Sequence, residues 1–351
     1  MIYKVISSLL KNADPEFAHS IAIKLLKNNI LPISLFAQKN SSKLQIKVLG
    51  KTFENPIGLA AGFDKNAEIY NSIFKLGFGF AEVGTITPLA QPGNPKPRVF
   101  RLSEDRGIIN RLGFPSVGLN EVKKTIINNK PTGILGVNIG PNKETVDKIK
   151  DYITCFESFF DLCDYICINI SSPNTPNLRD LHAKDKIEEL LKAIKNKQRE
   201  LNTKTKILLK ISPDINDTTI SELANIVLSE KIDGLVLTNT TISRNNNLKS
   251  SYKSEQGGLS GLPLENNSNE IIKKFFRILK NRIPIIGAGG VHDGTSALAK
   301  IKSGASLIQL YTSLVYEGPL VANKINNELV KLLEDEGFAS LKDAVGKDCV
   351  Q

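Results

Sequence analysis

Eight short apolar runs recur between residues 57 and 310, and this repetition constrains the fold more than any other feature of the chain. Each run is nearly continuous in apolar residues, which is typical of parallel strands that are covered on both faces. Most runs are followed by a segment with helical spacing, such as 67–76, 184–200, 218–229, 269–279 and 294–302. The runs themselves occupy residues 57–61, 80–84, 134–139, 165–170, 207–211, 234–238, 284–288 and 306–310.

The alternation of eight strands with helices predicts a closed (β/α)8 barrel, the TIM barrel, because an open doubly wound sheet usually has only about five or six strands. Apolar and polar residues alternate over 44–53, on both sides of the turn signal Leu49-Gly50-Lys51. This pattern predicts a small hairpin that closes the bottom of the barrel. We expect a barrel domain over residues 41–351 and a separate extension over residues 1–40.

The apolar pattern of residues 1–40 predicts two amphipathic helices. Apolar residues at positions 2, 5, 6, 9 and 10 share one helical stripe. Asp14-Pro15-Glu16 then supplies a helix start, and Phe17, Ile21 and Leu25 share a face of the second helix. Residues 1–40 carry five lysines against two acids, a net charge of +3. A basic amphipathic pair fits either a membrane interface or a cap packed on the barrel, and the residues leave both open.

The net charge of +10 indicates an anionic partner of some kind. No zinc finger, basic zipper or RNA-binding aromatic signature accompanies it, so we expect no nucleic-acid partner. The longest uncharged stretches, 165–178 and 303–316, are shorter than the roughly 18 residues of a membrane span, so no transmembrane helix is expected. The four cysteines and three histidines lack the spacing of a metal site, which predicts free thiols and no bound metal.

Active sites of such barrels lie at the carboxyl ends of the strands, and those positions here are rich in glycine and polar residues. The glycines at 287–290, together with Tyr311-Thr312, predict a phosphate site built from backbone amides. Lys210 lies inside an apolar run, where an unpaired ammonium costs several kcal/mol, so we interpret it as functional. Lys65 follows a strand end and faces either the site or water. Ser172 has no visible His and Asp partners, so its spacing alone does not make it catalytic.

These residues leave several functions open. One is a lyase or aldolase that uses Lys65 or Lys210 as a Schiff base. Another is a basic adaptor for membranes or nucleic acid, which explains the charge but not the polar strand ends. Longer strings at 58–65, 91–98, 110–114, 169–176, 238–241 and 257–261 resemble the class 2 dihydroorotate dehydrogenase family, and the resemblance runs from residue 14 to residue 338.

The resemblance implies an FMN-containing (β/α)8 barrel that oxidises dihydroorotate to orotate in de novo pyrimidine biosynthesis and passes the electrons to a membrane quinone. A soluble enzyme linked to fumarate or NAD is the alternative, because only residues 1–40 and Ser172 favour quinone. The same resemblance implies a peripheral protein on the cytoplasmic side of the cell membrane, resting on an anionic surface.

Particular residues follow from the resemblance. The flavin would be contacted by Ala61, Gly62, Phe63, Asp64, Lys65, Thr85, Asn138, Asn169, Lys210 and Thr238, and its ribityl phosphate by Gly261, Gly290, Tyr311 and Thr312. The substrate would be held by Lys65, Asn110, Arg111, Leu112, Gly113, Phe114, Asn169, Asn174, Asn239 and Thr240. The quinone would meet His19, Arg101 and Tyr311.

Ser172 matches the catalytic base of the family, where class 1 enzymes use cysteine. The resemblance implies that Ser172 takes a proton from carbon 5 of dihydroorotate while a hydride leaves carbon 6 for the flavin. Lys210 would stabilise negative charge near flavin N1 and O2. Because a neutral serine is a weak base, we expect its proton to leave through Thr175 and a water beside Phe114. The N-terminal helices would roof the quinone tunnel.

Overall fold

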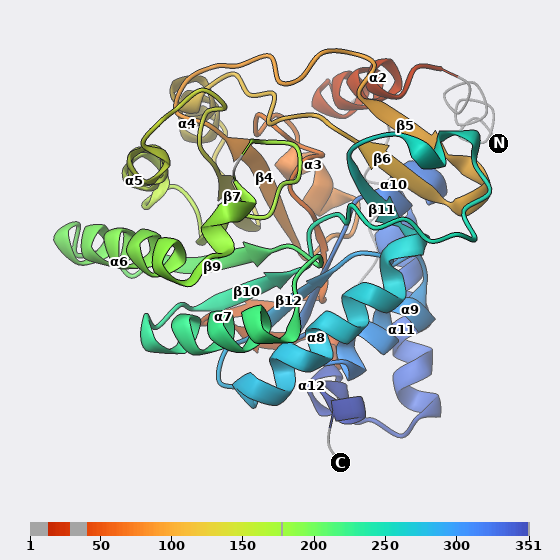
Figure 1. Ribbon diagram of the computed structural model, residues 1–351. Coiled ribbons are helices and arrows are strands. Elements are labelled where there is room, and N and C mark those ends of the chain that lie inside the picture. Colours follow the sequence, from red (N-terminus) through yellow and green to blue (C-terminus); the bar gives the residue numbers. More distant parts are fainter. Residues whose placement is uncertain (1–12, 29–40, 177, 350–351) are drawn as a thin grey trace.

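The computed structural model (Figure 1) describes residues 13–28, 41–176 and 178–349, and eight parallel strands form a closed barrel at its centre. The barrel closes where β13 pairs with β3, with Ile308 opposite Ile57. The strands are β3 (Ile57–Leu59), β4 (Phe80–Ile86), β7 (Ile134–Ile139), β8 (Tyr165–Asn169), β9 (Lys206–Ile211), β10 (Gly234–Leu237), β12 (Ile285–Ala288) and β13 (Leu307–Leu310). Each strand lies at one of the predicted runs, so the (β/α)8 TIM barrel is confirmed.

Helices surround the barrel. They are α3 (Tyr70–Lys75), α4 (Leu119–Asn128), α5 (Lys148–Phe159), α6 (Lys184–Glu200), α7 (Asp217–Ser229), α8 (Glu265–Leu279), α9 (Gly294–Lys302), α10 (Thr312–Glu317), α11 (Val321–Asp335) and α12 (Leu341–Ala344). α6 and α9 begin and end at the predicted residues. The start of α9 is fixed by a capping box, in which the Asp293 side chain accepts from Ser296 N at 2.8 Å.

The barrel interior is filled by side chains that meet across it. Glu82 of β4 accepts hydrogen bonds from Tyr165 of β8 at 3.1 Å and from Gln309 of β13 at 2.7 Å, and all three residues are buried. Gly136 makes room for this cluster, because a Cβ there would lie 2.1 Å from the Tyr165 ring. The interior is therefore a packed core, and ligands are confined to the ends of the barrel.

The predicted hairpin closes the bottom of the barrel. It consists of β1 (Ile46–Val48) and β2 (Lys51–Phe53), paired antiparallel. Leu49 and Gly50 at its tip both have positive φ, 54° and 77°, as a two-residue hairpin turn requires. Phe53 stacks edge-on against Phe80 at the start of β4, with ring centroids 5.4 Å apart, which seals this end.

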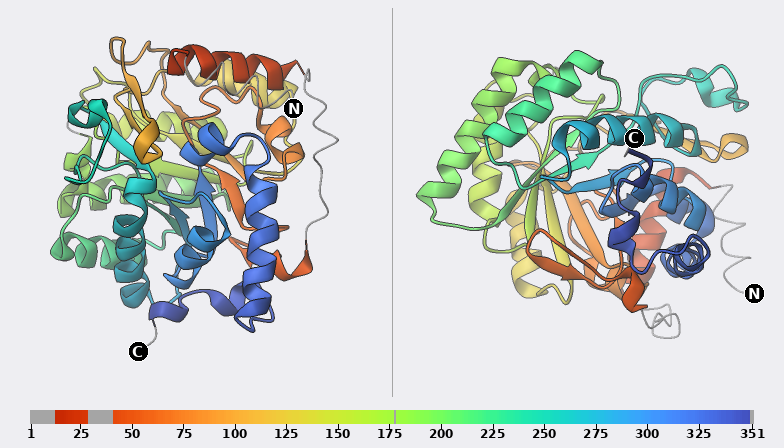
Figure 2. Two further views of the ribbon diagram at one scale, coloured as in Figure 1. Left: turned by 90° about the vertical axis from the view of Figure 1, so that its right-hand side faces the viewer. Right: turned by 90° about the horizontal axis from the view of Figure 1, so that it is seen from below.

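A second sheet, which the sequence did not predict, stands on the opposite end. β5 (Val99–Leu102), β6 (Gly107–Asn110) and β11 (Gly258–Gly261) form it in antiparallel order β11-β6-β5. It has a small core of its own, made of Phe100, Leu102, Ile109, Leu248 and Leu259. Helix α2 (Pro15–Lys27) lies at this same end, away from the C terminus (Figure 1 and Figure 2).

Helix α2 is the second helix predicted in the extension; the first, over residues 2–10, lies outside the described residues. α2 starts where expected, because the Asp14 side chain accepts from Phe17 N at 2.8 Å. Its buried residues are Ala18 and Leu26, whereas Phe17 is 59% exposed, so the predicted apolar face is not the face that packs on the barrel. No helix within the described ranges combines the length and hydropathy of a membrane span.

Candidate active site

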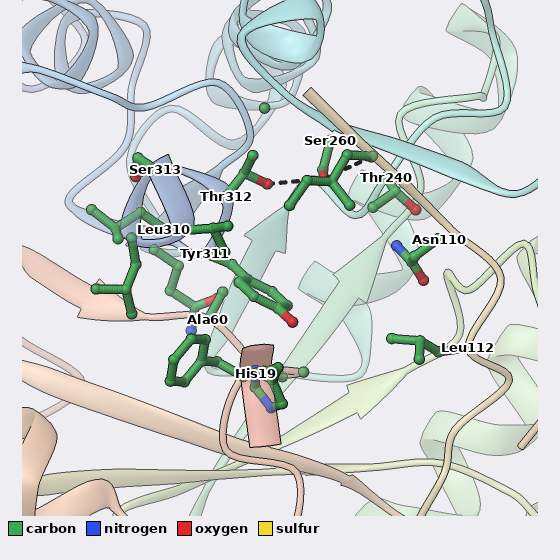
Figure 3. A pocket seen from close by; sticks show the side chains of 18 of the residues that line it. His19, Ala60, Asn110, Leu112, Thr240, Ser260, Leu310, Tyr311, Thr312 and Ser313 are labelled. Carbon is green, nitrogen blue, oxygen red and sulfur yellow. Dashed lines mark hydrogen bonds between the residues drawn. The ribbon is translucent and has the colours of Figure 1, made fainter. Parts of the chain in front are cut away.

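A cavity of about 570 Å³ lies at the carboxyl ends of the barrel strands. Its floor is formed by the strand ends and its roof by α2 and the sheet of β5, β6 and β11. In Figure 3, Asn110, Leu112 and Thr240 line one side of the view, Leu310 and Ser313 the other, and His19 lies between them. Segments from residue 15 to residue 320 meet here.

Most of the predicted site residues line this cavity. From the flavin set these are Ala61, Gly62, Phe63, Lys65, Thr85, Asn169, Lys210, Thr238, Gly261, Gly290, Tyr311 and Thr312. From the substrate set they are Asn110, Leu112, Gly113, Phe114, Asn174, Asn239 and Thr240, and from the remaining predictions Ser172, His19 and Arg101. The fold thus brings together residues that the sequence separates widely, and their individual roles stay predictions.

Three predicted residues are not in the cavity wall. Asp64 is buried behind it and accepts hydrogen bonds from the backbone of Glu68 at 2.7 Å and of Ile69 at 2.9 Å. Burial raises the pKa of Asp64 to about 6. Arg111 points outward, where it pairs with Glu255 at 2.6 Å. Asn138, the third, lies one layer below the floor.

The floor of the cavity is a network of amides and a hydroxyl. Thr85 donates to Asn138 at 2.6 Å, and the Asn169 amide donates to Thr85 at 3.0 Å and to Asn138 at 3.1 Å. Asn138 in turn donates to Glu82 at 2.8 Å, which ties the floor to the barrel core. This network fixes the Asn169 side chain, which lines the cavity and which can both donate and accept.

Lys210 on β9 supplies positive charge to the floor. Lys210 is 5% exposed and lines the cavity. Its burial agrees with its place in an apolar run of the sequence. Among the described residues, its ammonium has no hydrogen bond or ion pair. A buried ammonium in this state favours an anionic or electron-rich group beside it.

The turn after β12 presents backbone donors. Gly289 and Gly290 have φ of 106° and 85°, the left-handed region that suits glycine. Neither backbone N–H has an acceptor within the described part of the chain. Across the cavity Thr312 donates to Ser260 at 2.9 Å (Figure 3). Backbone amides that lack an acceptor in the described ranges, at the end of the seventh strand and beside the start of the helix after the eighth, are suited to a phosphate.

Ser172 lies on the loop after β8. It is 4% exposed, and its hydroxyl accepts from Asn174 N at 3.2 Å while facing the cavity. The Thr175 hydroxyl nearby is buried without a hydrogen-bond partner among the described residues. Asn174 reaches across to β6 and donates to Asn110 O at 3.0 Å. The loop therefore sits between the floor and the roof.

Arg179, which the sequence did not indicate, clamps three strand-end loops together. Its guanidinium donates to Ser171 O at 3.2 Å, to Thr240 O at 3.1 Å and to the Asp214 carboxylate at 2.9 Å. These acceptors follow β8, β10 and β9 respectively. A planar guanidinium can hold several acceptors in fixed directions, so Arg179 sets the relative position of the loops that carry Ser172 and Thr240.

The α2 side of the cavity is aromatic and basic. His19 stacks edge-on against Phe63 at 4.9 Å, and Phe63 stacks against Tyr311 at 5.5 Å. Burial, together with the Lys65 charge, lowers the pKa of His19 to about 3, so its ring is neutral at pH 7. Burial also lowers the pKa of Lys65 to about 8, opposed by the carboxylates of Glu16 and Asp64.

Polar contacts hold α2 in this position. Glu16 pairs with the largely buried Arg98 at 2.9 Å, and Arg98 also donates to two backbone carbonyls. At the other end of α2, Ser72 donates to Leu26 O at 3.1 Å. Arg101 reaches Ala13 O at 2.7 Å just before the helix. The helix is thus a fixed wall of the cavity.

No cluster of three metal-ligating side chains occurs in the portion of the chain described, and the four cysteines are free thiols. Some lining residues were not predicted, notably Ser260 on β11 and Gln309 on β13. Glu82, in the core beneath the site, could have been noticed in the sequence. It is an acid inside an apolar run, just as Lys210 is a base inside one.

Comparisons with known proteins agree on one family. The sequence profile of the family described as dihydroorotate dehydrogenase matches residues 43–333. The dihydroorotate dehydrogenase (quinone) of Bartonella tribocorum is 46% identical over 96% of this chain and 94% of its own. The mitochondrial dihydroorotate dehydrogenase (quinone) of Mus musculus is 43% identical over 97% of this chain and 88% of its own. The crystal structure of DHODH from Eimeria tenella in complex with ferulenol superposes with a TM-score of 0.93 at 38% identity, covering 98% of both chains.

Proposed function

Because the chain belongs to the dihydroorotate dehydrogenase family, we propose that the cavity above the strand ends is the site where its substrate and cofactor meet. The chain oxidises dihydroorotate to orotate in pyrimidine biosynthesis, and a quinone accepts the electrons. The observation that carries the assignment of the site is the buried Lys210 ammonium, which has no hydrogen bond or ion pair among the described residues and lies on the strand position next to Asn169. The relatives named for quinone disfavour both a fumarate- or NAD-linked enzyme and a Schiff-base lyase.

The cofactor is FMN, which supplies the hydride acceptor when bound. The residues present fit such a group. The Gly289 and Gly290 amides, which have no acceptor among the described residues, suit its phosphate, and Lys210 suits the electron-rich edge of its ring. The Thr312 hydroxyl, which donates to Ser260, would turn to the same phosphate when it is bound. The roles of the other predicted flavin contacts, from Ala61 to Thr238, belong to the same proposal.

Ser172 is our candidate for the base that removes a proton from the substrate. Ser172 lines the cavity, and within the described part of the chain its hydroxyl only accepts, from Asn174 N, which leaves its own proton free to be passed on. The Thr175 hydroxyl, which has no partner among the described residues, is the next carrier in this proposal, as in the sequence-based expectation. Amides of Asn110, Asn174 and Asn239 line the same region and can hold the ring and carboxylate of the substrate.

We assign the quinone to the α2 side, beside His19 and Tyr311, where the wall is aromatic and the histidine neutral. With the quinone placed there, we propose that residues 1–40 are the quinone and membrane segment and that residues 41–351 are the catalytic barrel. Exposed Phe17 and Lys24, seven residues apart on one face of α2, support a peripheral contact with an anionic membrane surface. We propose the cytoplasmic side of the cell membrane for this contact.

Purified full-length protein tests the proposal directly. We expect a yellow flavin spectrum and dihydroorotate-dependent reduction of a soluble quinone analogue, faster than reduction of fumarate or NAD. A colourless protein, or one that prefers fumarate or NAD, would contradict it. Binding to vesicles that contain anionic lipid, weakened by Phe17→Ser relative to Ile242→Ser at another exposed apolar position, would separate membrane contact from a purely structural cap.

A further inference from the structure

A fully buried lysine that takes no part in the site described above lies beneath the turn after β12. Lys300 on α9 is completely shielded from solvent. Its ammonium donates to Ser268 Oγ at 3.0 Å and to Asn269 Oδ1 at 2.6 Å, both on α8. Within the described residues, no carboxylate forms a salt bridge with it. Burying an ammonium against neutral oxygens alone is costly, so this arrangement requires a physical reason.

A short chain of hydrogen bonds joins Lys300 to the backbone of the turn. The Ser268 hydroxyl, which accepts from Lys300, donates to Ala288 O at 2.6 Å. The same carbonyl accepts from Thr238 N at 2.9 Å. In a trans peptide the C=O and the following N–H point in opposite directions, so these two contacts fix the direction of the Gly289 N–H. That N–H is one of the two unpaired donors of the turn.

The lysine also packs directly on the end of β12. A Cβ at Gly287 would lie 2.7 Å from the Lys300 side chain, so this position has no room for any other residue type. Burial lowers the pKa of Lys300 to about 7, against the opposing charge of Glu265. A lysine so placed gains a proton readily when an anion arrives nearby, because the anion favours the charged form.

We propose that Lys300 is a positioning residue for the phosphate of the cofactor. It acts from below the turn through Ser268 and the Ala288–Gly289 peptide, without touching the ligand. Charge held in the protein interior is screened little by water and salt, so it attracts an anion at the turn more strongly than a surface lysine does. The inference rests on the proposed function, because the phosphate in question is that of FMN.

Riboflavin provides the test, because it has the flavin ring without the phosphate. Full-length holoenzyme is diluted, and release of FMN, or of riboflavin loaded by exchange, is followed by flavin fluorescence to give dissociation constants. We expect Lys300→Met to weaken FMN binding about tenfold, which equals about 1.4 kcal/mol, and to leave riboflavin binding unchanged. Lys302→Met is the matched control on the same helix, because Lys302 pairs at the surface with Glu336 at 2.9 Å. This control variant should change neither dissociation constant.

Failure of the proposed function and failure of the Lys300 role give different results. A wild-type protein that does not bind FMN overturns the proposed function. A wild-type protein that binds FMN, with Lys300→Met either unchanged or weakened equally for both flavins, overturns only the role of Lys300. Lys300→Gln, which keeps a donor for Ser268, is measured in the same way if the methionine variant does not fold. If neither variant yields protein that binds riboflavin, Lys300 is a core residue and the inference is wrong.

Discussion

The clamp made by Arg179 gives the sharpest prediction about catalysis. Replacement by lysine keeps the charge but offers a single ammonium in place of a planar guanidinium, so Asp214 stays paired while Ser171 O and Thr240 O lose their donor. Hydrogen bonds from charged donors contribute about 1.5–3 kcal/mol each, and at the lower figure, which suits these partly exposed groups, the loss of two costs about 3 kcal/mol. At about 1.4 kcal/mol per tenfold, that lowers the ratio of ordered to disordered loop about a hundredfold, which is the upper limit for the fall in the ordered population.

The expected result of Arg179→Lys is a fall of up to about a hundredfold in the rate at which saturating dihydroorotate reduces the bound flavin, measured by stopped flow. FMN content should stay unchanged, because the phosphate turn and Lys210 are not held by this clamp. Arg282→Lys is the control, since Arg282 also donates to backbone carbonyls, but at the end of α8. A rate within about threefold of wild type, or an equal loss in the control, would refute the reasoning.

Three further predictions concern the reacting groups and the roof. Ser172→Ala should abolish flavin reduction by dihydroorotate while orotate still binds; retained reduction would remove Ser172 as the base. The affinity for the orotate anion should fall as the pH rises through about 8, because Lys65, whose pKa is lowered to about 8, loses its charge there, and Lys65→Met should flatten this titration. A pH-independent wild type would contradict that role. Deleting residues 1–40, or breaking the anchor with Glu16→Gln, should slow quinone reduction much more than flavin reduction by saturating dihydroorotate, since α2 walls the quinone side and acts on the substrate only through the effect of Glu16 on the charge of Lys65. Equal losses in the two steps would make α2 a structural cap.

The barrel was predictable because its signal is local. Each strand is a run of consecutive apolar residues, and the pairing of such runs follows from their order along the chain. The hairpin at 46–53 was predictable for the same reason, since the turn residues lie between its strands. The pairing of β11 with β6 was missed because β11 lies about 150 residues after β6 and nothing local marks that pairing. The hairpin of β5 and β6 was missed although it is local, because its strands are only four residues each.

The sequence indicated most of the residues that line the cavity, but not the direction in which each side chain points. Lys210 stood out because its charge conflicts with its neighbours, and the structure places it in the cavity floor. Asp64 and Asn138 lie in predicted strings but point into the protein, since strand and turn geometry decides which of two neighbours faces the cavity. Arg179 and Lys300 gave no sequence signal, because their partners come from other loops and helices.

The pairing of β13 with β3 joins the last barrel strand to the first. During synthesis the ribosome releases β3 early and β13 late, so the wall formed by Tyr311 and Thr312 is added after every other part of the barrel. A chain that is interrupted before residue 312 therefore has no complete place for a flavin phosphate. The flavin-to-protein stoichiometry of a preparation therefore cannot exceed the fraction of polypeptides that extend past residue 312 and have closed the barrel.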